Sequence, residues 1–267
     1  MKLTFLGTNG SCGFNNKNRL KYGTSTLCVV VSAGNETLIF DSGAGIHGIS
    51  AIPEHQREHF HLFFSHYHTD HISGFLFFPC LFDPDKKIDI YGSAVDFASV
   101  KDVITRFLSP PFAPVGLETI QAKLDFHTIE AGIMMSLPNG TKIETHSLSH
   151  PGGTLGYRVE YEGKTFCYLT DVELGKHQDD DSLLAFMHAA DLLIMDSVYD
   201  DGQTITGFGH SSWRECADWA GRAGAKQLAL YHYGFKQSDA DIDEMEKKAK
   251  KVFPDTFATR DGMQVEL

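Results

Sequence analysis

The sequence predicts an α/β protein in which two mixed β-sheets pack together and helices cover their outer faces, an αββα order of layers. Short runs rich in β-branched and aromatic residues, separated by Gly, Asn and Ser, recur in both halves of the chain. Amphipathic helical patterns lie between several of these runs. Because some runs are joined by tight turns and others by helices, we expect both antiparallel and parallel pairing.

The first half of the chain is rich in predicted strands. A helix is predicted over roughly 69–80 and a second over 94–108, where apolar residues recur at helical spacing. Consecutive prolines at positions 110 and 111 end the second helix. The strands of this half are expected at 2–7, 24–32, 37–41, 61–65 and 88–92.

The second half repeats this style. A helix is predicted over 211–225, with Ser211 or Ser212 as its N-cap, and a charged amphipathic helix over 239–252. Glu162 and Gly163 form a turn between two strands. The strands of this half are expected at 124–129, 141–148, 155–161, 164–171, 191–196 and 227–233.

The composition limits the classes of protein to which this chain can belong. No repeat or Pro/Gly/Ser linker divides the 267 residues, so a single domain over 1–267 is expected. The 42% hydrophobic content excludes disordered and collagen-like classes. A formal net charge of −12 argues against a large phosphate-binding surface and thus against nucleic acid as a partner. Scattered cysteines and the lack of a long apolar window favour a cytoplasmic protein without a membrane span.

A dense group of metal-binding side chains directly follows the predicted strand at 61–65. The chain there reads Ser-His-Tyr-His-Thr-Asp-His, which places His66, His68, Asp70 and His71 within six positions. Imidazole and carboxylate groups hold Zn²⁺ in hydrolytic enzymes. The spacing allows two ions, because His66 and His68 point the same way in an extended segment while Asp70 and His71 begin a helix. A polar surface loop with several histidines is the simpler alternative.

This run resembles the signature of the metallo-β-lactamase superfamily of metal-dependent hydrolases. That family adds a His at a strand end, a bridging Asp about twenty residues later and a final His near the C-terminus. His150, Asp171 and His232 match those positions, with Asp171 21 residues after His150. The glycine-rich segment 40–46 matches the family's Asp-x-Gly turn, which implies that Asp41 and Gly43 support the site. The resemblance extends from Leu6-Gly7-Thr8 to His232 and implies the αββα sandwich of the metallo-β-lactamase type.

The resemblance also implies the ligand set of two divalent metal ions. Zn²⁺ is expected first, and Mn or Fe would also suit nitrogen and oxygen ligands. A hydroxide shared by the two ions would be the nucleophile. Taken alone, His150 or His232 would more often be a structural histidine. The implied ligands are His66, His68 and His150 for the first ion, Asp70, His71 and His232 for the second, and Asp171 as the bridge.

A second motif resembles the ribonuclease Z branch of that superfamily. His210 and Ser211 open the predicted helix at 211–225, as a His-Ser-Thr motif does in that branch. The resemblance implies that His210 donates a proton to the leaving oxygen and that Asp196 orients it, although that branch commonly has Glu there. A helix cap for His210 and a turn residue for Asp196 are the structural alternatives. Asp70 could also receive the proton of the nucleophile.

Two differences from ribonuclease Z narrow the range of possible substrates. Only 20 residues separate His150 from Asp171, too few for the basic arm of the bacterial enzymes, and Lys236 stands where the branch usually has Arg. Lys236 is the candidate substrate-binding residue, because a lysine still binds phosphate as a point charge. The second His of the H-x-H run is His68, where the diiron branch usually has Glu, which disfavours redox chemistry. The Pro- and Phe-rich loop at 109–114 either walls the substrate pocket or connects elements at the surface.

The predicted function is therefore hydrolysis of a small phosphodiester, such as a cyclic nucleotide or cyclic phosphate, at a dinuclear metal centre. Three alternatives keep the same metal ligands: a ribonuclease Z-like RNA endonuclease, a lactone or thioester hydrolase, and a non-catalytic metal-binding sensor. The resemblance alone implies a homodimer.

Overall fold

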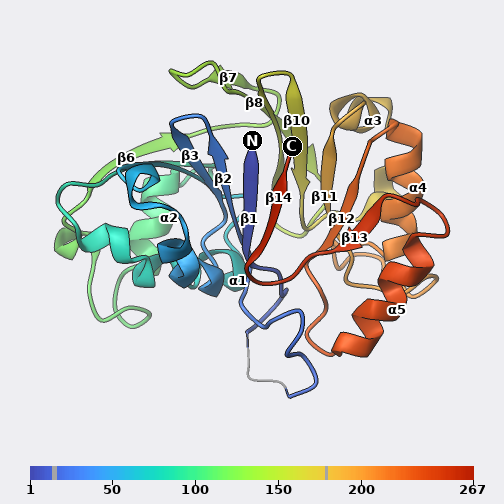
Figure 1. Ribbon diagram of the computed structural model, residues 1–267. Coiled ribbons are helices and arrows are strands. Elements are labelled where there is room, and N and C mark those ends of the chain that lie inside the picture. The colour runs from blue at the N-terminus through green and yellow to red at the C-terminus, as the bar shows by residue number, and fades with distance from the viewer. Residues whose placement is uncertain (14–16, 178–179) are drawn as a thin grey trace.

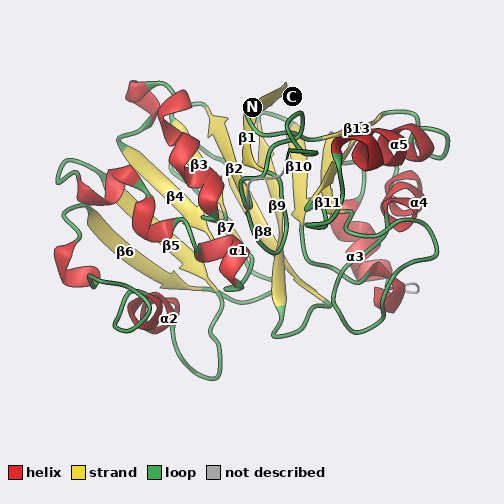
Figure 2. Ribbon diagram, turned by 90° about the horizontal axis from the view of Figure 1, so that it is seen from below, coloured by secondary structure: helices red, strands yellow, loops and turns green. Residues whose placement is uncertain are grey.

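The computed structural model describes residues 1–13, 17–177 and 180–267. In these ranges fourteen strands form two seven-stranded sheets, which lie face to face with helices on both outer sides (Figures 1 and 2). The predicted class, an α/β sandwich with two mixed sheets, is confirmed. In Figure 1 both chain termini lie at one end of the sandwich, and the short helix α1 (Thr69–Ile72) lies toward the opposite end.

The first sheet has the order β14-β1-β2-β3-β4-β5-β6. Its pairing is antiparallel from β14 to β3 and parallel from β3 to β6. Its strands are β1 (Lys2–Gly7), β2 (Cys28–Ala33), β3 (Glu36–Phe40), β4 (His59–Phe63), β5 (Lys87–Gly92), β6 (Lys123–Thr128) and β14 (Met263–Glu266).

The second sheet mirrors this plan with the order β13-β12-β11-β10-β9-β8-β7. Its pairing is antiparallel from β7 to β10 and parallel from β10 to β13. Its strands are β7 (Met134–Ser136), β8 (Lys142–Leu148), β9 (Thr154–Tyr161), β10 (Lys164–Leu169), β11 (Leu192–Asp196), β12 (Leu228–Tyr231) and β13 (Thr256–Ala258).

Helices cover the outer face of each sheet. Short 3₁₀ segments and α2 pack on the first sheet, and α3, α4 and α5 pack on the second. The remaining α-helices are α2 (Val100–Phe107), α3 (Asp181–Met187), α4 (Trp213–Ala223) and α5 (Asp239–Ala249). The 3₁₀ segments are Ala44–Ala51, Glu54–Gln56, Phe75–Phe77, Pro79–Phe82, Leu117–Thr119 and Leu174–His177.

Strand alternation builds three apolar cores. In β11, Leu192 and Ile194 face the core between the sheets, while Leu193 and Met195 face the core beneath α3, α4 and α5. A third core lies between the first sheet and its own helices. Because β11 is buried on both faces, it reads as a continuous apolar run, as expected for a parallel strand under helices.

Serine caps set the starts of three helices. Ser99, Ser212 and Ser238 each accept a hydrogen bond from the backbone N–H three residues on, and the acidic side chain at that position bonds back to the cap. Ser212, not Ser211, is therefore the N-cap of α4. The Oγ of Ser211 instead donates to the carbonyl of Val172 and fastens the helix start to the loop after β10.

Three helix predictions were too long. The segment 69–80 is not one helix: α1 stops at Ile72, and 3₁₀ turns follow it. At Gly74 a Cβ would lie 2.1 Å from the carbonyl oxygen of Gly43, so the chain bends there to pass close to the glycine-rich turn. The helix expected over 94–108 begins only at Val100, because Ser99 caps it and the preceding segment forms a turn. The helix expected to reach residue 252 ends at Ala249.

Among the strands and α-helices of the described ranges, four had no sequence prediction: β7, α3, β13 and β14. Each has seven residues or fewer, and three of them lie at sheet edges, where pairing with a neighbour rather than a long apolar pattern creates the strand. In the described part of the chain, no helix is long and apolar enough to cross a membrane.

Candidate metal centre

The candidate site lies where the loops after β4, β8, β10 and β12 meet at one end of the two sheets. These loops carry His66 to His71, His150, Asp171 and His232 respectively. The structure thus brings all seven sequence-predicted metal ligands to one place, although they come from both sheets.

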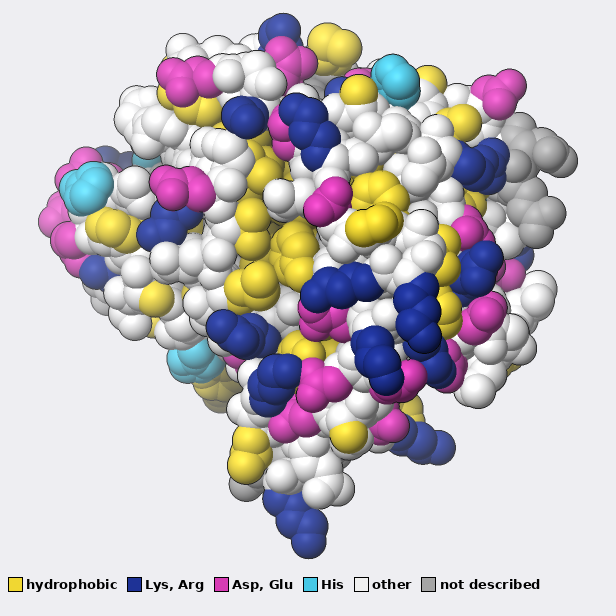
Figure 3. Space-filling view, turned by 45° about the vertical axis from the view of Figure 1, so that its right-hand side comes forward, with side chains coloured by type: hydrophobic (Ala, Val, Ile, Leu, Met, Phe, Trp, Pro, Cys, Tyr) yellow, Lys and Arg dark blue, Asp and Glu magenta, His cyan; other side chains and the backbone are white. Residues whose placement is uncertain are grey.

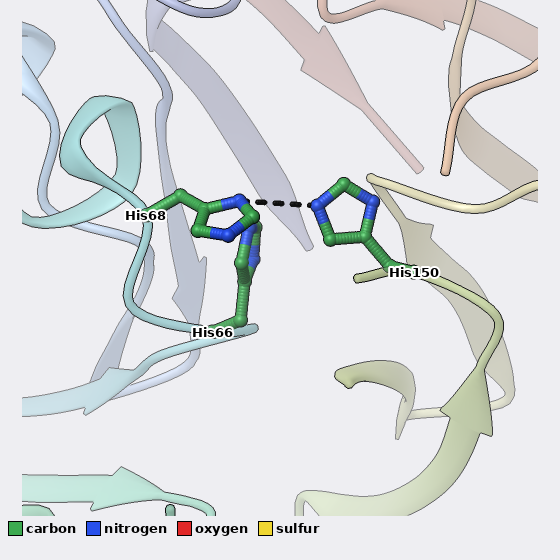
Figure 4. Close-up of side chains that lie close together, drawn as sticks. All are labelled: His66, His68 and His150. Carbon is green, nitrogen blue, oxygen red and sulfur yellow. Dashed lines mark hydrogen bonds between the residues drawn. The ribbon is translucent and has the colours of Figure 1, made fainter. Parts of the chain in front are cut away.

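Three histidines form the first group (Figure 4). His66 and His68 extend from the loop after β4, and His150 approaches from the loop after β8. Nε2 of His150 lies 3.1 Å from Nδ1 of His68, and the His66 ring centroid is 4.8 Å from that of His150. Nδ1 of His150 donates to the carbonyl oxygen of Gly209 at 2.8 Å, which leaves its Nε2 lone pair for a cation.

Asp70, His71 and His232 form the second group. Oδ2 of Asp70 lies 3.6 Å from Nε2 of His71 and 3.4 Å from Nε2 of His232. The same carboxylate oxygen accepts a hydrogen bond from the backbone N–H of Ser11 at 2.7 Å. All three side chains of the group are buried.

Asp171 stands between the two groups. Its Oδ1 lies 3.9 Å from Nε2 of His66 and 3.6 Å from Nε2 of His150. Its Oδ2 lies 3.1 Å from Nε2 of His71 and 3.2 Å from Nε2 of His232. One oxygen faces each group, which is the arrangement that a bridging carboxylate requires.

The donor atoms fit divalent metal ions. Nε2 of His66, Nε2 of His71 and both ring nitrogens of His232 are buried and have no hydrogen-bond partner among the described residues. Buried polar atoms are rarely left unpaired in a folded protein, and a bound cation would satisfy them. Ligand atoms around a tetrahedral Zn²⁺ with bonds of about 2.0–2.1 Å lie roughly 3.3 Å apart, and the distances across each group match that spacing.

Electrostatics favour positive charge at this point. Burial lowers the pKa of the His66, His68 and His150 rings, so each is neutral at pH 7 and can offer a lone pair. Burial also disfavours charge on His71 and His232, yet the Asp171 carboxylate outweighs it and raises the pKa of both rings. Protons supply the positive charge in the metal-free chain, and metal binding would replace them.

Asp41 supports the centre from beneath, as the resemblance implied. Its buried carboxylate accepts hydrogen bonds from Nδ1 of His71 at 2.7 Å, from the backbone N–H of Ser65 at 2.8 Å and from the hydroxyl of Tyr168 at 2.8 Å. These bonds hold the His71 ring with Nε2 toward Asp171, a role that carboxylates commonly play behind metal-binding histidines. Tyr168 belongs to β10, so the bond also ties the two sheets together.

Backbone strain is concentrated here. Asp41, Asp171 and His232 have φ values of 60°, 55° and 58°, in the left-handed region that favours glycine. Such conformations cost about 1–2 kcal/mol per residue and persist only where the surroundings enforce them. All three residues follow the ends of buried strands, where the turn directs each side chain toward the centre.

His210 and Asp196 lie beside the second group. Oδ2 of the fully buried Asp196 accepts a hydrogen bond from Nδ1 of His210 at 2.6 Å. The His210 ring centroid is 4.9 Å from that of His232 and 5.3 Å from that of His150. Burial disfavours the charged ring, but the Asp196 carboxylate outweighs burial and raises the pKa of His210. Because Ser212 is the N-cap of α4, His210 does not cap that helix, and its ring lies against the candidate metal ligands instead.

An open depression of about 350 Å³ lies over the centre and includes His68, Asp70, Asp171 and His210 in its wall. Its volume suits a small ligand. Another depression, of about 300 Å³, lies between α5 and the segment after β11, but Asp200, Asp241 and Glu244 line it and would repel an anionic substrate.

Two sequence-predicted elements do not join the centre. Lys236 is exposed, its ammonium lies 5.6 Å from the Phe235 ring centroid, and in the described ranges no hydrogen bond or ion pair connects it to the histidines. The loop at 109–114 follows α2 and contributes no residue to the wall of the depression over the centre. The loop therefore suits a surface connection better than a pocket wall.

Sequence reasoning missed three contributors. Ser11 holds Asp70 through a backbone N–H, which no side-chain pattern reveals. Gly10 packs so closely that a Cβ would lie 2.2 Å from the His232 ring, and Glu173 accepts from the backbone N–H groups of Gly207 and Gly209, which hold the loop before His210. The only sequence signal for these was the glycine content of the two loops.

Comparison with known proteins agrees with this geometry. Residues 37–233 match the family described as the beta-lactamase superfamily domain, and the chain belongs to that superfamily. The family match and the clustered His and Asp side chains indicate a metal-dependent hydrolase, and the relatives described below carry the name ribonuclease Z.

Ribonuclease Z of Gemmatimonas aurantiaca is 26% identical over 98% of this chain and 95% of its own length. Ribonuclease Z of Lactococcus lactis is 23% identical over 98% of both chains. Among solved structures, the metallo-β-lactamase fold protein YhfI from Bacillus subtilis has a TM-score of 0.76 at 22% identity and covers 100% of this chain and 98% of its own. The short form of human tRNase Z has a TM-score of 0.72 at 20% identity, with 100% and 99% covered.

Proposed function

We propose that this protein is a dinuclear metal-dependent phosphodiesterase that hydrolyses small phosphodiesters, such as cyclic nucleotides or cyclic phosphates. The observation that carries this proposal is the His210–Asp196 pair beside the candidate metal ligands. Ester hydrolysis at phosphorus expels an alkoxide, which is a poor leaving group. A protonated imidazole at this position is the acid that such a reaction needs.

The ligand groups define what a metal pair would contribute. His66, His68 and His150 would hold one ion, Asp70, His71 and His232 the other, and Asp171 would contact both. Two divalent ions, with Zn²⁺ favoured by the nitrogen-rich donor set, supply Lewis acidity and lower the pKa of water so that it can act as a nucleophile near pH 7.

His210 would act as the general acid. Its Nδ1 donates to Asp196, so Nε2 is the nitrogen left to give a proton to the departing oxygen. The raised pKa keeps a larger fraction of the ring protonated near pH 7. Asp70, held by the N–H of Ser11, is a candidate acceptor for the proton of the attacking water.

The size of the substrate follows from what surrounds the centre. The 20 residues between His150 and Asp171 are taken up by β9, β10 and the loops that flank them, so no arm for a folded RNA extends from that place. On the face shown in Figure 3, blue Lys and Arg side chains lie among magenta Asp and Glu side chains. The ion pairs of α5 show the same balance: Lys248 pairs with Asp200 at 3.1 Å, and Lys247 pairs with Glu244 at 3.0 Å. Such paired charges add little affinity for phosphates.

RNA endonuclease activity is the second candidate. It is favoured by relatives named ribonuclease Z that match 98% of this chain. The same site geometry would serve both reactions, because each cleaves a phosphodiester and expels an alkoxide.

The test is hydrolysis by protein loaded with Zn²⁺ or Mn²⁺. Bis-(p-nitrophenyl) phosphate, 2′,3′- and 3′,5′-cyclic nucleotides, a precursor tRNA, a lactone and a thioester would be assayed with the wild type, Asp171→Ala and His210→Ala. We expect turnover of a cyclic nucleotide that Asp171→Ala abolishes and His210→Ala lowers by about 10²–10⁴-fold.

Other outcomes would redirect the assignment. Cleavage of the precursor tRNA far above that of every small diester would favour the RNA endonuclease. Turnover of the lactone or thioester, unaffected by His210→Ala and without phosphodiester cleavage, would contradict the proposal. Tight metal binding without turnover of any substrate would identify a sensor.

A further inference from the structure

A second group of metal-binding side chains lies at the other end of β4, away from the candidate catalytic centre. Glu36 on β3 and His59 and His61 on β4 have donor atoms within 4.8 Å of one another. Asp89 on β5 adjoins them, with its Oδ2 2.6 Å from Nε2 of His59 and 3.7 Å from Nδ1 of His61. None of these residues takes part in the chemistry proposed above.

Strand register creates this group. His61 is paired with Leu38 on β3 and with Asp89 on β5 in parallel register. Alternation along β4 turns Phe60 and Leu62 toward the outer helices and Phe63 toward the second sheet, so His59 and His61 share the inner face. A conventional strand would place apolar residues there. This one places imidazoles between two carboxylates.

Burial makes the arrangement costly without a cation. Glu36 is 6% exposed, His61 2% and Asp89 5%. Asp89 is balanced by Lys87, whose Nζ lies 3.1 Å from its Oδ1. For Glu36 the ion-pair partner in the described part of the chain is His61, whose Nε2 lies 3.0 Å from its Oε2. In the described ranges no lysine or arginine forms an ion pair with Glu36, so a bound cation would compensate this buried charge.

The donor set suits Zn²⁺. Two imidazoles and one carboxylate are a common ligand combination for that ion, and water completes the tetrahedron. The Asp89 carboxylate bonds to the His59 ring, in the way that carboxylates orient ligating histidines in zinc proteins. The side chain of His59 is 36% exposed, so an ion can enter from solvent and keep one open position.

We propose that Glu36, His59 and His61 are the ligands of a further divalent metal site that binds Zn²⁺, with Asp89 as the positioning residue for His59. The ion would join β3 to β4 on the inner face of the first sheet and neutralise Glu36. This site is independent of the proposed hydrolytic function, because it shares no residue with that centre.

The experiment counts metal ions in a protein whose catalytic centre is disabled. The full chain carrying His66→Ala, Asp171→Ala and His232→Ala, which removes a ligand from each group of the catalytic centre and the bridge between them, would be stripped with a chelator, dialysed against Zn²⁺ and analysed by inductively coupled plasma mass spectrometry. We expect one equivalent of Zn²⁺ per chain, lost on further substitution of His59→Gln or His61→Gln. His146→Gln, which changes a histidine on β8 that bonds to Ser182, is the control and should keep the equivalent.

A second measurement guards against misfolding of the disabled protein. In the otherwise unchanged chain, His59→Gln should lower the Zn²⁺ content by one equivalent and leave the circular dichroism spectrum and the hydrolysis rate unaltered. The proposal is overturned if His59→Gln and His61→Gln bind as much Zn²⁺ as their parents, or if the disabled protein binds none while remaining folded. The Zn²⁺ count does not depend on whether the wild type hydrolyses any substrate. Failure of the proposed function can therefore be distinguished from failure of this metal site.

Discussion

Nδ1 of His210 lies 2.6 Å from Oδ2 of Asp196, and Asp196 is completely buried at the end of β11. The carboxylate has a second bond, accepted from the backbone N–H of Val198 at 3.1 Å, which fixes its orientation. A histidine held in this way has one tautomer and one free nitrogen. The pair therefore fixes the ring of a mostly buried loop histidine, with one free nitrogen, beside the candidate metal ligands.

The pH dependence of the reaction tests this pair. A general acid must be protonated, so kcat falls as pH rises through the pKa of His210. Asp196 raises that pKa. Asp196→Asn keeps the shape but removes the charge, so the high-pH limb of the kcat profile should move to lower pH and the plateau should fall. Asp218→Asn, which alters the exposed pair that Asp218 forms with Arg214 at 3.0 Å, is the control. An unmoved limb in Asp196→Asn would refute the assignment.

Metal affinity tests the support given by Asp41. Asp41→Asn removes the negative charge behind His71 and offers one acceptor oxygen where the carboxylate uses two. We expect metal affinity to fall by about 10–100-fold, measured by competition with a chromophoric chelator. Asp191→Asn alters another buried carboxylate, which bonds to Thr165 and Lys226 at the opposite end of β11 from Asp196, and should leave metal affinity unchanged. Equal affinity in Asp41→Asn and the wild type would show that His71 needs no such support.

Packing against His232 is tested by one added methyl group. At Gly10 a Cβ would lie 2.2 Å from Cε1 of His232, so Gly10→Ala must displace the ring. A displacement of about 1 Å in a catalytic group can cost about 10²-fold in rate, and we expect a loss of that size in kcat/KM. Gly221→Ala on α4, where a Cβ meets nothing within 4 Å, should keep full activity and stabilise the fold by about 0.5–1 kcal/mol. Retained activity in Gly10→Ala would mean that the position of His232 is unimportant.

The sequence predicts the parts of the fold that depend on local pattern. The apolar strands and the run from His66 to His71 are local features, and their consequences appear where expected. The end of α1 was not predictable in this way, because it depends on the approach of Gly74 to Gly43, which are far apart in sequence. The edge strands β7, β13 and β14 likewise depend on neighbours that only the folded sheet supplies.

The same distinction holds in the site. Histidines and aspartates can be recognised by type and spacing, so the seven candidate ligands and His210 were identifiable from sequence. The contribution of Ser11 comes from its backbone N–H and carries no residue signature. Glu36 and His61 are 25 positions apart and meet only through the parallel pairing of β3 and β4, so the additional metal-binding group could not be predicted from spacing.

The most direct test of the central claim is the dependence of the rate on the leaving group. The substrates would be phosphodiesters that share one esterified group and differ in the second alcohol, whose pKa increases along the series. Their hydrolysis would be measured with metal-loaded wild type and with metal-loaded His210→Ala. If His210 protonates the departing oxygen, the wild-type rate depends weakly on the leaving-group pKa, and the variant loses little with p-nitrophenol but about 10²–10⁴-fold with an alkyl or ribose alcohol. Parallel dependences for the two proteins, with the same loss at every leaving group, would contradict the account.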